Sequence, residues 1–120
     1  MKIVMTTSSN SLDAELDKRF GRAPGFLIYN SETQEHEFID NRQNINAAQG
    51  AGIQAAQNVA EAGVQAVVSG HFGPKAFRAL EAAGVEMFTC EAKTVDDALM
   101  DFKRERLSAS DAPDVEGHWA

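Results

Sequence analysis

A short run of small, aromatic and basic residues, Ser69-Gly70-His71-Phe72-Gly73-Pro74-Lys75, carries the clearest chemical signal in this sequence. It follows the apolar run Val64–Val68 and precedes a helical pattern that starts at Pro74, a favoured first helical position. A loop placed there lies between the carboxyl end of a strand and the amino end of a helix. Open α/β sheets bind ligands at such points, and helix amino termini favour anions. The run therefore predicts an anion-binding loop.

The residues of this loop each have a second, structural interpretation. Gly70 and Gly73 would let a ligand approach the backbone, or they would only make a tight strand-to-helix turn. His71 could donate to an anion or ligate a metal, whereas a solvated loop histidine is the more common case. Phe72 would form an apolar wall if exposed and would belong to the core if it packed inward. The run lacks the Gly-Lys-Ser/Thr ending of a nucleotide-binding P-loop, which excludes that site.

A second loop concentrates basic charge. Lys18, Arg19 and Arg22 lie within five positions, in and just before the run Phe20-Gly21-Arg22-Ala23-Pro24. The small neighbours of Arg22 would let its guanidinium group reach a ligand. The alternative is a surface arginine paired with a nearby carboxylate: Asp13, Glu15 or Asp17. Our hypothesis is that the two loops together hold an anionic cofactor.

Composition limits the classes of function. A chain of 120 residues, 43% hydrophobic and 24% charged, is expected to form one globular domain. Its net charge of −7 argues against non-specific binding to nucleic acid or to anionic membranes. A small anion is still allowed, because salt confines each charge to roughly 10 Å. The single cysteine, Cys90, excludes an internal disulfide and a four-thiolate metal site within one chain, and we expect a buried, inert thiol.

Location and catalysis are predicted mainly from features that the sequence lacks. Residues 1–6 show no long apolar stretch of signal-peptide type, and no segment approaches membrane-spanning length, which favours the cytoplasm. Ser8 and Ser9 have no neighbouring histidine, and Met5-Thr6 stand where a two-metal nuclease would need an acid. We therefore predict a protein without catalytic residues.

Apolar periodicity predicts the elements that would position the loops. Strands are expected over Lys2–Thr7, Phe26–Tyr29, Glu35–Asp40, Val64–Val68 and Val85–Phe88. Residues 41–49 are expected to form a loop. The second and third strands should form an antiparallel hairpin, and the crossovers in the second half should be right-handed and join parallel strands. The fold class is thus α/β, a five-stranded mixed sheet flanked by helices.

Three helices are expected around this sheet. One follows Gly50-Ala51-Gly52 and would bury Ile53, Ala56 and Ala60. Another runs from Pro74 towards Gly84, and the third follows a capping arrangement at Thr94. The apolar stripe of the third helix consists of Val95, Ala98, Leu99 and Phe102. We predict a single cofactor-binding domain over residues 1–107 and a mobile tail over 108–120, whose His118-Trp119 could act as a lid or fray.

Four motifs in combination resemble the dinitrogenase iron–molybdenum cofactor biosynthesis family. They are Phe20-Gly21-Arg22-Ala23-Pro24, Gly50-Ala51-Gly52-Ile53-Gln54-Ala55-Ala56, Ser69-Gly70-His71-Phe72-Gly73-Pro74-Lys75-Ala76-Phe77 and Val115-Glu116-Gly117-His118-Trp119. The similarity runs over nearly the whole chain. It implies a ribonuclease-H-like fold. Chain length and the single cysteine are most similar to small stand-alone members that hold a molybdenum–copper sulfide cluster without covalent attachment.

The resemblance implies non-covalent binding and carriage of an anionic metal–sulfide cluster, either molybdenum–copper or a related FeMo-type thiometalate. Some members are associated with ATPases linked to cell division, which makes such ATPases candidate partners. Carried over by position, the residues bordering the cluster would be Phe20, Gly21, Arg22, Ala23, Ser69, Gly70, His71, Phe72, Gly73 and Pro74. Because sulfide already saturates the metals, backbone amides, one or two cations and an apolar wall would be enough to hold the cluster.

Two alternatives stay open at this point. A metal-dependent hydrolase or nuclease is suggested only by analogy with the ribonuclease-H-like fold, and it would need clustered carboxylates. An interaction module that docks on an ATPase without any cluster would need neither the amides nor the cations.

Overall fold

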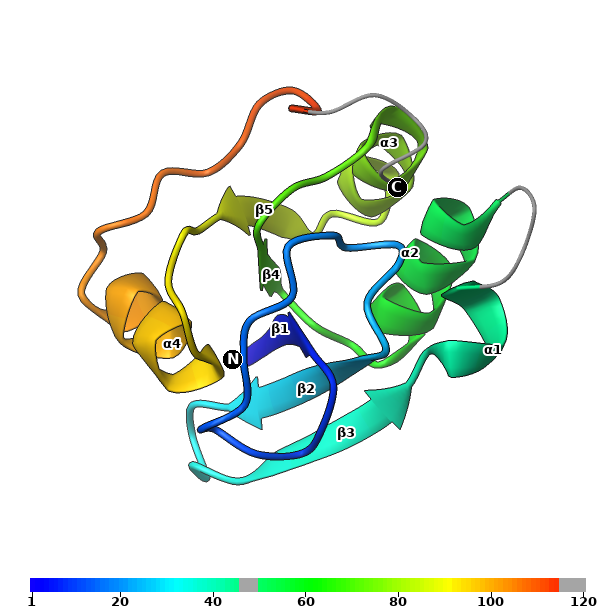
Figure 1. Cartoon of the computed structure of the whole chain (residues 1–120). Helices are drawn as coiled ribbons and strands as arrows, with labels where there is room; N and C mark the ends of the chain where they lie inside the picture. Colours follow the sequence, from blue (N-terminus) through cyan, green and yellow to red (C-terminus); the bar gives the residue numbers. More distant parts are fainter. Residues whose placement is uncertain (46–49, 115–120) are drawn as a thin grey trace.

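The computed structural model of the chain describes residues 1–45 and 50–114. Its five strands are β1 (Lys2–Thr7), β2 (Gly25–Asn30), β3 (His36–Asp40), β4 (Ala66–Ser69) and β5 (Glu86–Thr89). They form one sheet in the order β3-β2-β1-β4-β5 (Figure 1). β2 pairs antiparallel with β1 and β3, whereas β4 pairs parallel with β1 and β5. The predicted α/β fold with a mixed sheet is confirmed.

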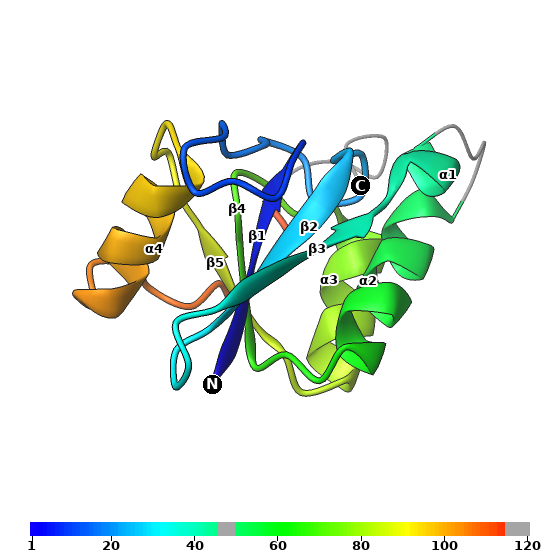
Figure 2. The ribbon, with the colours of Figure 1, turned by 90° about the horizontal axis from the view of Figure 1, so that it is seen from below.

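Helices cover both faces of the sheet: α2 (Ala51–Glu61) and α3 (Pro74–Ala82) lie on one face, and α4 (Val95–Lys103) lies on the other (Figure 2). Side chains of the central strands alternate between these layers. Val4 and Val67 point to the α2–α3 side, whereas Met5 and Val68 point to the α4 side. All four are buried, which explains why β1 and β4 are near-continuous apolar runs.

The buried face of α2 differs from the predicted one. It consists of small residues with one valine: Ala51, Gly52, Ala55, Ala56 and Val59. Ile53 is 36% exposed and Ala60 is only partly buried, so that part of the prediction was wrong. Ala56 belongs to both faces, and an alanine-rich helix lets several overlapping stripes satisfy helical spacing. The contact with α3 selects the face with the smallest side chains, since these allow close approach.

The segment before α2 also differs from the prediction. Residues 41–49 were expected to be loop, but Arg42–Ile45 form the single-turn helix α1. Asp40 initiates the turn, because its carboxylate accepts the backbone N–H of Arg42 at 2.8 Å and contacts the guanidinium group at 3.2 Å. A one-turn helix of polar residues carries no apolar periodicity, so the sequence gave no helical signal here.

All three longer helices begin at the edge of the sheet where β1, β4 and β5 end (Figure 2). Thr94 caps α4 as predicted, since its hydroxyl accepts the backbone N–H of Asp97 at 3.1 Å. α3 starts at Pro74 as predicted, behind Gly73, and neither Gly73 nor the Gly50 that precedes α2 supplies a side-chain cap. Loop backbone and helix amino termini therefore lie together at this edge of the sheet. This is where α/β sheets bind ligands.

The tail beyond α4 returns to the sheet. Ala109 forms an antiparallel bridge with Phe88 of β5, and the backbone N–H of Ser110 donates to the carbonyl of Met87 at 2.7 Å. The mobility of residues 108–120 stays a prediction, and His118-Trp119 lie outside the described residues. In the described part of the chain, no helix is long and apolar enough to cross a membrane.

Candidate cofactor-binding cleft

A long connection between β1 and β2 forms one wall of the candidate site, and hydrogen bonds fix it to the end of β1. The buried Thr6 hydroxyl donates to the carbonyl of Asp17 at 2.8 Å and lies 2.9 Å from the hydroxyl of Ser69. The Thr7 hydroxyl donates to the carbonyl of Glu15 at 2.8 Å. Residues 15–17 are therefore held at the carboxyl ends of β1 and β4.

The β1–β2 connection then passes directly over the loop that follows β4. Arg19 forms a parallel bridge with His71, and the N–H of Phe20 donates to the carbonyl of His71 at 3.2 Å. A Cβ atom on Gly70 would lie 2.7 Å from Cα of Lys18 and 2.8 Å from its carbonyl oxygen. The two loops that sequence analysis singled out are thus in direct backbone contact, as our hypothesis required.

The other wall is the loop between β5 and α4. The N–H of Leu16 donates to the carbonyl of Lys93 at 3.0 Å, and Glu15 forms an antiparallel bridge with Thr94. The N–H of Val95 donates to the carbonyl of Ala14 at 2.9 Å. The β1–β2 connection is therefore fixed on both sides, to the β4 loop and to the β5 loop.

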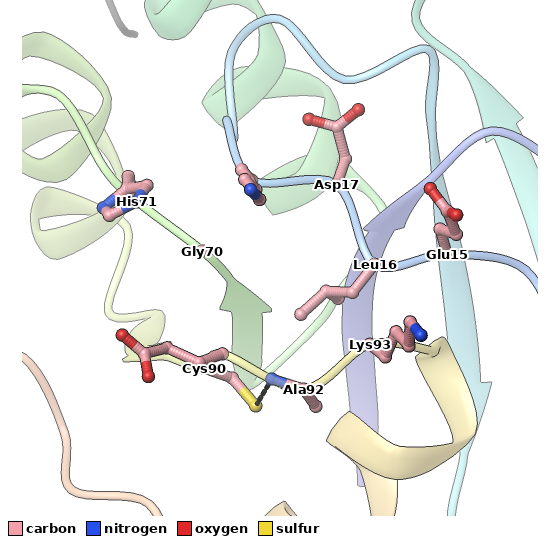
Figure 3. A pocket seen from close by; sticks show the side chains of 10 residues that line it. Glu15, Leu16, Asp17, Gly70, His71, Cys90, Ala92 and Lys93 are labelled. Atoms are coloured by element: carbon pink, nitrogen blue, oxygen red, sulfur yellow. Dashed lines mark hydrogen bonds between the residues drawn. The ribbon is translucent and has the colours of Figure 1, made fainter.

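A cleft of about 630 Å³ lies between these three segments (Figure 3). Its volume is in the range of small-molecule and cofactor sites. Leu16 reaches across it towards the β5 loop, and Gly70 and His71 border its other end. The lining residues are Glu15, Leu16, Asp17, Lys18, Gly70, His71, Cys90, Glu91, Ala92 and Lys93.

The cleft carries charge of both signs. Lys18 and Lys93 are exposed cations, and His71 adds an imidazole. Three carboxylates also line it, but Asp17 points away from Cys90 and accepts the backbone N–H of Arg19 at 2.9 Å. The number of positive and negative side chains alone does not favour an anion. Selection of an anion therefore depends on where the lysines and the imidazole lie in the cleft.

Cys90 lies in this cleft with a neutral thiol. Its side chain is buried, at 7% exposure, and burial raises the pKa of the thiol. The N–H of Ala92, 3.4 Å from Sγ, lowers the pKa, whereas the charges of Asp101 and Glu91 raise it further. The thiol donates to Asp101 at 3.8 Å. The prediction of a buried thiol is confirmed, and the wall it forms is soft and uncharged.

Of the ten residues predicted to border a cofactor, Gly70 and His71 line the cleft. The side chains of Phe20, Ala23, Ser69 and Phe72 are each at most 1% exposed. Phe20 packs its ring against Phe72 at a centroid distance of 5.5 Å, so Phe72 belongs to the core and does not form an apolar wall. Ser69 serves the contact with Thr6. Whether any of these residues binds a ligand through its backbone stays a prediction.

The rest of the basic loop does not line the cleft and is held by hydrogen bonds from Asn41. Buried Asn41 donates its side-chain amide to the carbonyl of Ala23 at 2.9 Å and to that of Gly21 at 3.5 Å. Its backbone N–H donates to the carbonyl of Pro24 at 2.8 Å. Arg22, half-buried, extends from this segment. Gly73 is the N-cap residue of α3, and Pro74 is its first residue. A role of Gly21, Arg22, Gly73 and Pro74 in cofactor binding stays a prediction.

Sequence reasoning missed the β5 side of the cleft. Cys90 and Lys93 follow β5 just as Gly70 and His71 follow β4, and the edge rule for parallel strands could have placed them together. The β5 loop contains no glycine and so lacks the usual mark of a binding loop. Within residues 1–45 and 50–114, no three His, Cys, Asp or Glu side chains gather to hold a metal ion.

Comparison with known proteins identifies the family. The pattern of the dinitrogenase iron–molybdenum cofactor family matches residues 1–105. The chain belongs to this family. The resemblance seen in the sequence is thereby confirmed, and the match extends from β1 to just beyond α4.

Solved structures of similar proteins share the whole fold. The apo form of the orange protein from Desulfovibrio gigas is 36% identical, with a TM-score of 0.92 over 95% of this chain and 96% of that one. A putative NifB protein from Thermotoga is 30% identical, with a TM-score of 0.84 over 97% and 98%. An uncharacterized protein of Methanocaldococcus jannaschii is 28% identical over 110 residues, 89% of each chain. The orange protein is one of the small stand-alone members that the sequence was predicted to resemble, and this similarity is confirmed.

Proposed function

We propose that this protein binds and carries an anionic metal–sulfide cluster, without covalent attachment, in the cleft at the carboxyl edge of its sheet. Membership of a nitrogenase-cofactor family and similarity to the orange protein support a role in cluster binding or carriage. The observation that carries the proposal is the direct contact between the loops at Lys18 and Gly70, beside a cleft large enough for a cofactor.

The chemistry of the cleft suits a preassembled cluster better than a bare metal ion. A cluster whose metals are saturated by sulfide presents a soft, negatively charged surface. The neutral thiol of Cys90 and the side chain of Leu16 supply a soft wall, and Lys18 and Lys93 supply positive charge at its rim. Because the lysine contacts are ionic, binding should weaken as salt rises.

We further propose a molybdenum–copper sulfide cluster, with an FeMo-type thiometalate as the other candidate of the same chemistry. The role is that of a carrier and not of an enzyme. A metal-dependent hydrolase needs a cluster of carboxylates, and among the described residues no three His, Cys, Asp or Glu side chains are placed to hold a metal ion. The ribonuclease-H-like fold and an ATPase partner remain predictions from the family resemblance.

Reconstitution with matched charge variants tests this proposal. The protein is titrated with tetrathiomolybdate plus a copper salt, and cluster binding is followed by visible charge-transfer absorption and by metal analysis after gel filtration. The Lys18→Gln/Lys93→Gln double variant removes two charges from the cleft. The Arg78→Gln/Arg104→Gln double variant removes two exposed charges from α3 and from the end of α4.

The cleft variant should bind roughly three- to thirtyfold more weakly than the wild-type protein, as expected for two partly exposed ionic contacts. The control variant should stay within about twofold, because salt screens distant charges. If both double variants bound the cluster equally more weakly than the wild-type protein, cluster affinity would depend only on the net charge of the protein and not on the lysines of the cleft. Absence of any metal–sulfide species on the wild-type protein would refute the proposed function.

A further inference from the structure

We propose that the segment 108–114, here called the C-terminal strap, closes the rim of the cleft, and that Asp114 competes with the anionic cargo. The competition is for the donors of the loop that follows β4. This inference rests on the proposed function, since it assumes a negatively charged cargo at that rim. It adds a gate, in which a carboxylate of the chain itself occupies the donors until cargo displaces it.

Asp114 binds the loop at three points. One carboxylate oxygen accepts the backbone N–H of Phe72 at 2.8 Å, and the other lies 2.9 Å from Nδ1 of His71. The backbone N–H of Asp114 also donates to the carbonyl of Phe72 at 3.2 Å. A carboxylate held by a backbone amide and an imidazole is a bound anion, so this loop already holds an anionic group.

The contact lies at the border of the cleft. His71 lines the cleft, and its neighbour Phe72 directly precedes the start of α3. A polyanion seated beside His71 would bring further negative charge next to the Asp114 carboxylate. Like charges at contact distance repel, so full engagement of both at the same donors is unfavourable. Cargo and strap should therefore exclude each other in part.

The strap is held lightly enough to be displaced. Between Ala109, which bridges to Phe88, and Asp114, residues 111–113 are exposed. The side chains of His71 and Asp114 are themselves 39% and 38% exposed. Segments with few buried apolar contacts and exposed hydrogen bonds open at low free energy. The strap can thus respond to a ligand without unfolding of the domain.

Linkage gives the test two independent readouts. If cargo displaces the strap, removal of the strap's carboxylate must strengthen cargo binding by the same factor by which cargo loosens the strap. The variant is Asp114→Ala in the full-length protein. The matched control is Asp111→Ala, which removes the same charge from an exposed position on the same strap. The probe is tetrathiomolybdate plus a copper salt.

Asp114→Ala should bind the cluster about three- to tenfold more tightly than the wild-type protein, the range expected for release of a partly exposed ionic contact. Asp111→Ala should stay within about twofold, because its charge does not engage the loop. In the wild-type protein, hydrogen exchange at the Ser110 and Asp114 amides should speed up on loading by a similar factor.

The outcomes separate the two ideas. If the wild-type protein and Asp114→Ala bind the cluster with equal affinity, and loading leaves the protection of the strap amides unchanged, the gate is refuted while the proposed function stands. Weaker binding by Asp114→Ala also refutes the gate and makes Asp114 part of the binding site. If only Asp114→Ala binds, both ideas are supported. If neither protein binds, both fail together.

Discussion

The ends of β4 and β5 lie side by side at one edge of the sheet, and they are built by different means. At the end of β4, Ser69 and Gly70 make contacts within the protein: the serine hydroxyl contacts Thr6 of β1, and the glycine contacts the backbone of Lys18 in the β1–β2 connection. After β5, Cys90 and Lys93 present side chains to the cleft. The end of β4 fixes the β1–β2 connection, and the loop after β5 supplies side chains that a ligand in the cleft would contact.

This difference corrects a common inference from glycine-rich loops. Gly70 was predicted either to let a ligand approach the backbone or only to form a tight turn, and the space beside it is filled by another part of the same chain. The β5 loop, which contains no glycine, supplies four of the ten residues that line the cleft, as many as the β1–β2 connection. Substitutions at the β4 end should therefore cost stability, and substitutions at the β5 end should alter chemistry with little loss of stability.

Gly70→Ala should have the largest effect on stability. The added Cβ would lie under 3.0 Å from backbone atoms of Lys18, so the two loops must separate. Overpacking of this kind typically costs about 1–3 kcal/mol, which urea denaturation measures directly. Cys90→Ser, at the matching position after β5, should cost less. The comparison breaks down if the two variants unfold at the same urea concentration.

Thr6→Val tests the hydrogen bonds that hold the β1–β2 connection. The valine keeps the shape but leaves the carbonyl of Asp17 and the hydroxyl of Ser69 without the Thr6 hydroxyl. Loss of a buried partner costs about 1–2 kcal/mol in the free energy of unfolding. Thr89→Val, on half-buried β5, should change it by less than about 0.5 kcal/mol. A larger loss at Thr89 than at Thr6 would reverse our assignment.

Cys90 should show the smallest effect on stability and a clear pH dependence. Burial raises the pKa of its thiol in the folded state. The thiol therefore makes its full contribution to the free energy of unfolding at pH values below the pKa of the unfolded state. That contribution is lost as pH rises through the folded pKa. The stability difference between the wild-type protein and Cys90→Ala should therefore shrink under alkaline conditions, as followed by urea denaturation across pH.

Alkylation offers a direct check on the same thiol. Iodoacetamide should react with Cys90 in the native protein several-fold more slowly than in urea at neutral pH, because thiolate is the reactive form and the side chain is buried. Equal rates in the two states would show that this wall of the cleft is open and its thiol unperturbed.

Much of the fold could be predicted because local patterns and the fold agree. The run Lys2–Thr7, the hairpin of β2 and β3, the proline at the start of α3 and the Thr94 cap each follow from short-range rules. The face of α2 could not be predicted, because alanines at several spacings make the stripe ambiguous and the contact with α3 decides it.

The site was predicted only in part for a related reason. The sequence identified two loops that meet, since charge and glycine are visible in one dimension. It did not show that Phe20 and Phe72 are buried and pack together, nor that Asn41 donates hydrogen bonds to the backbone of residues 21–24. Those facts depend on contacts between segments far apart in the chain, as does the role of Lys93 beside Leu16.

Amide chemical-shift mapping of the full chain during titration with tetrathiomolybdate and copper tests most directly whether a metal–sulfide cluster binds in this cleft. We expect the largest shifts at Lys18, at Gly70 and His71, and at residues 90–93, which line the cleft. Little change is expected in β3, the edge strand beyond β2, or around Lys2 at the amino end of β1. Shifts concentrated around Lys2 and β3, or no shifts at saturating probe, would contradict it.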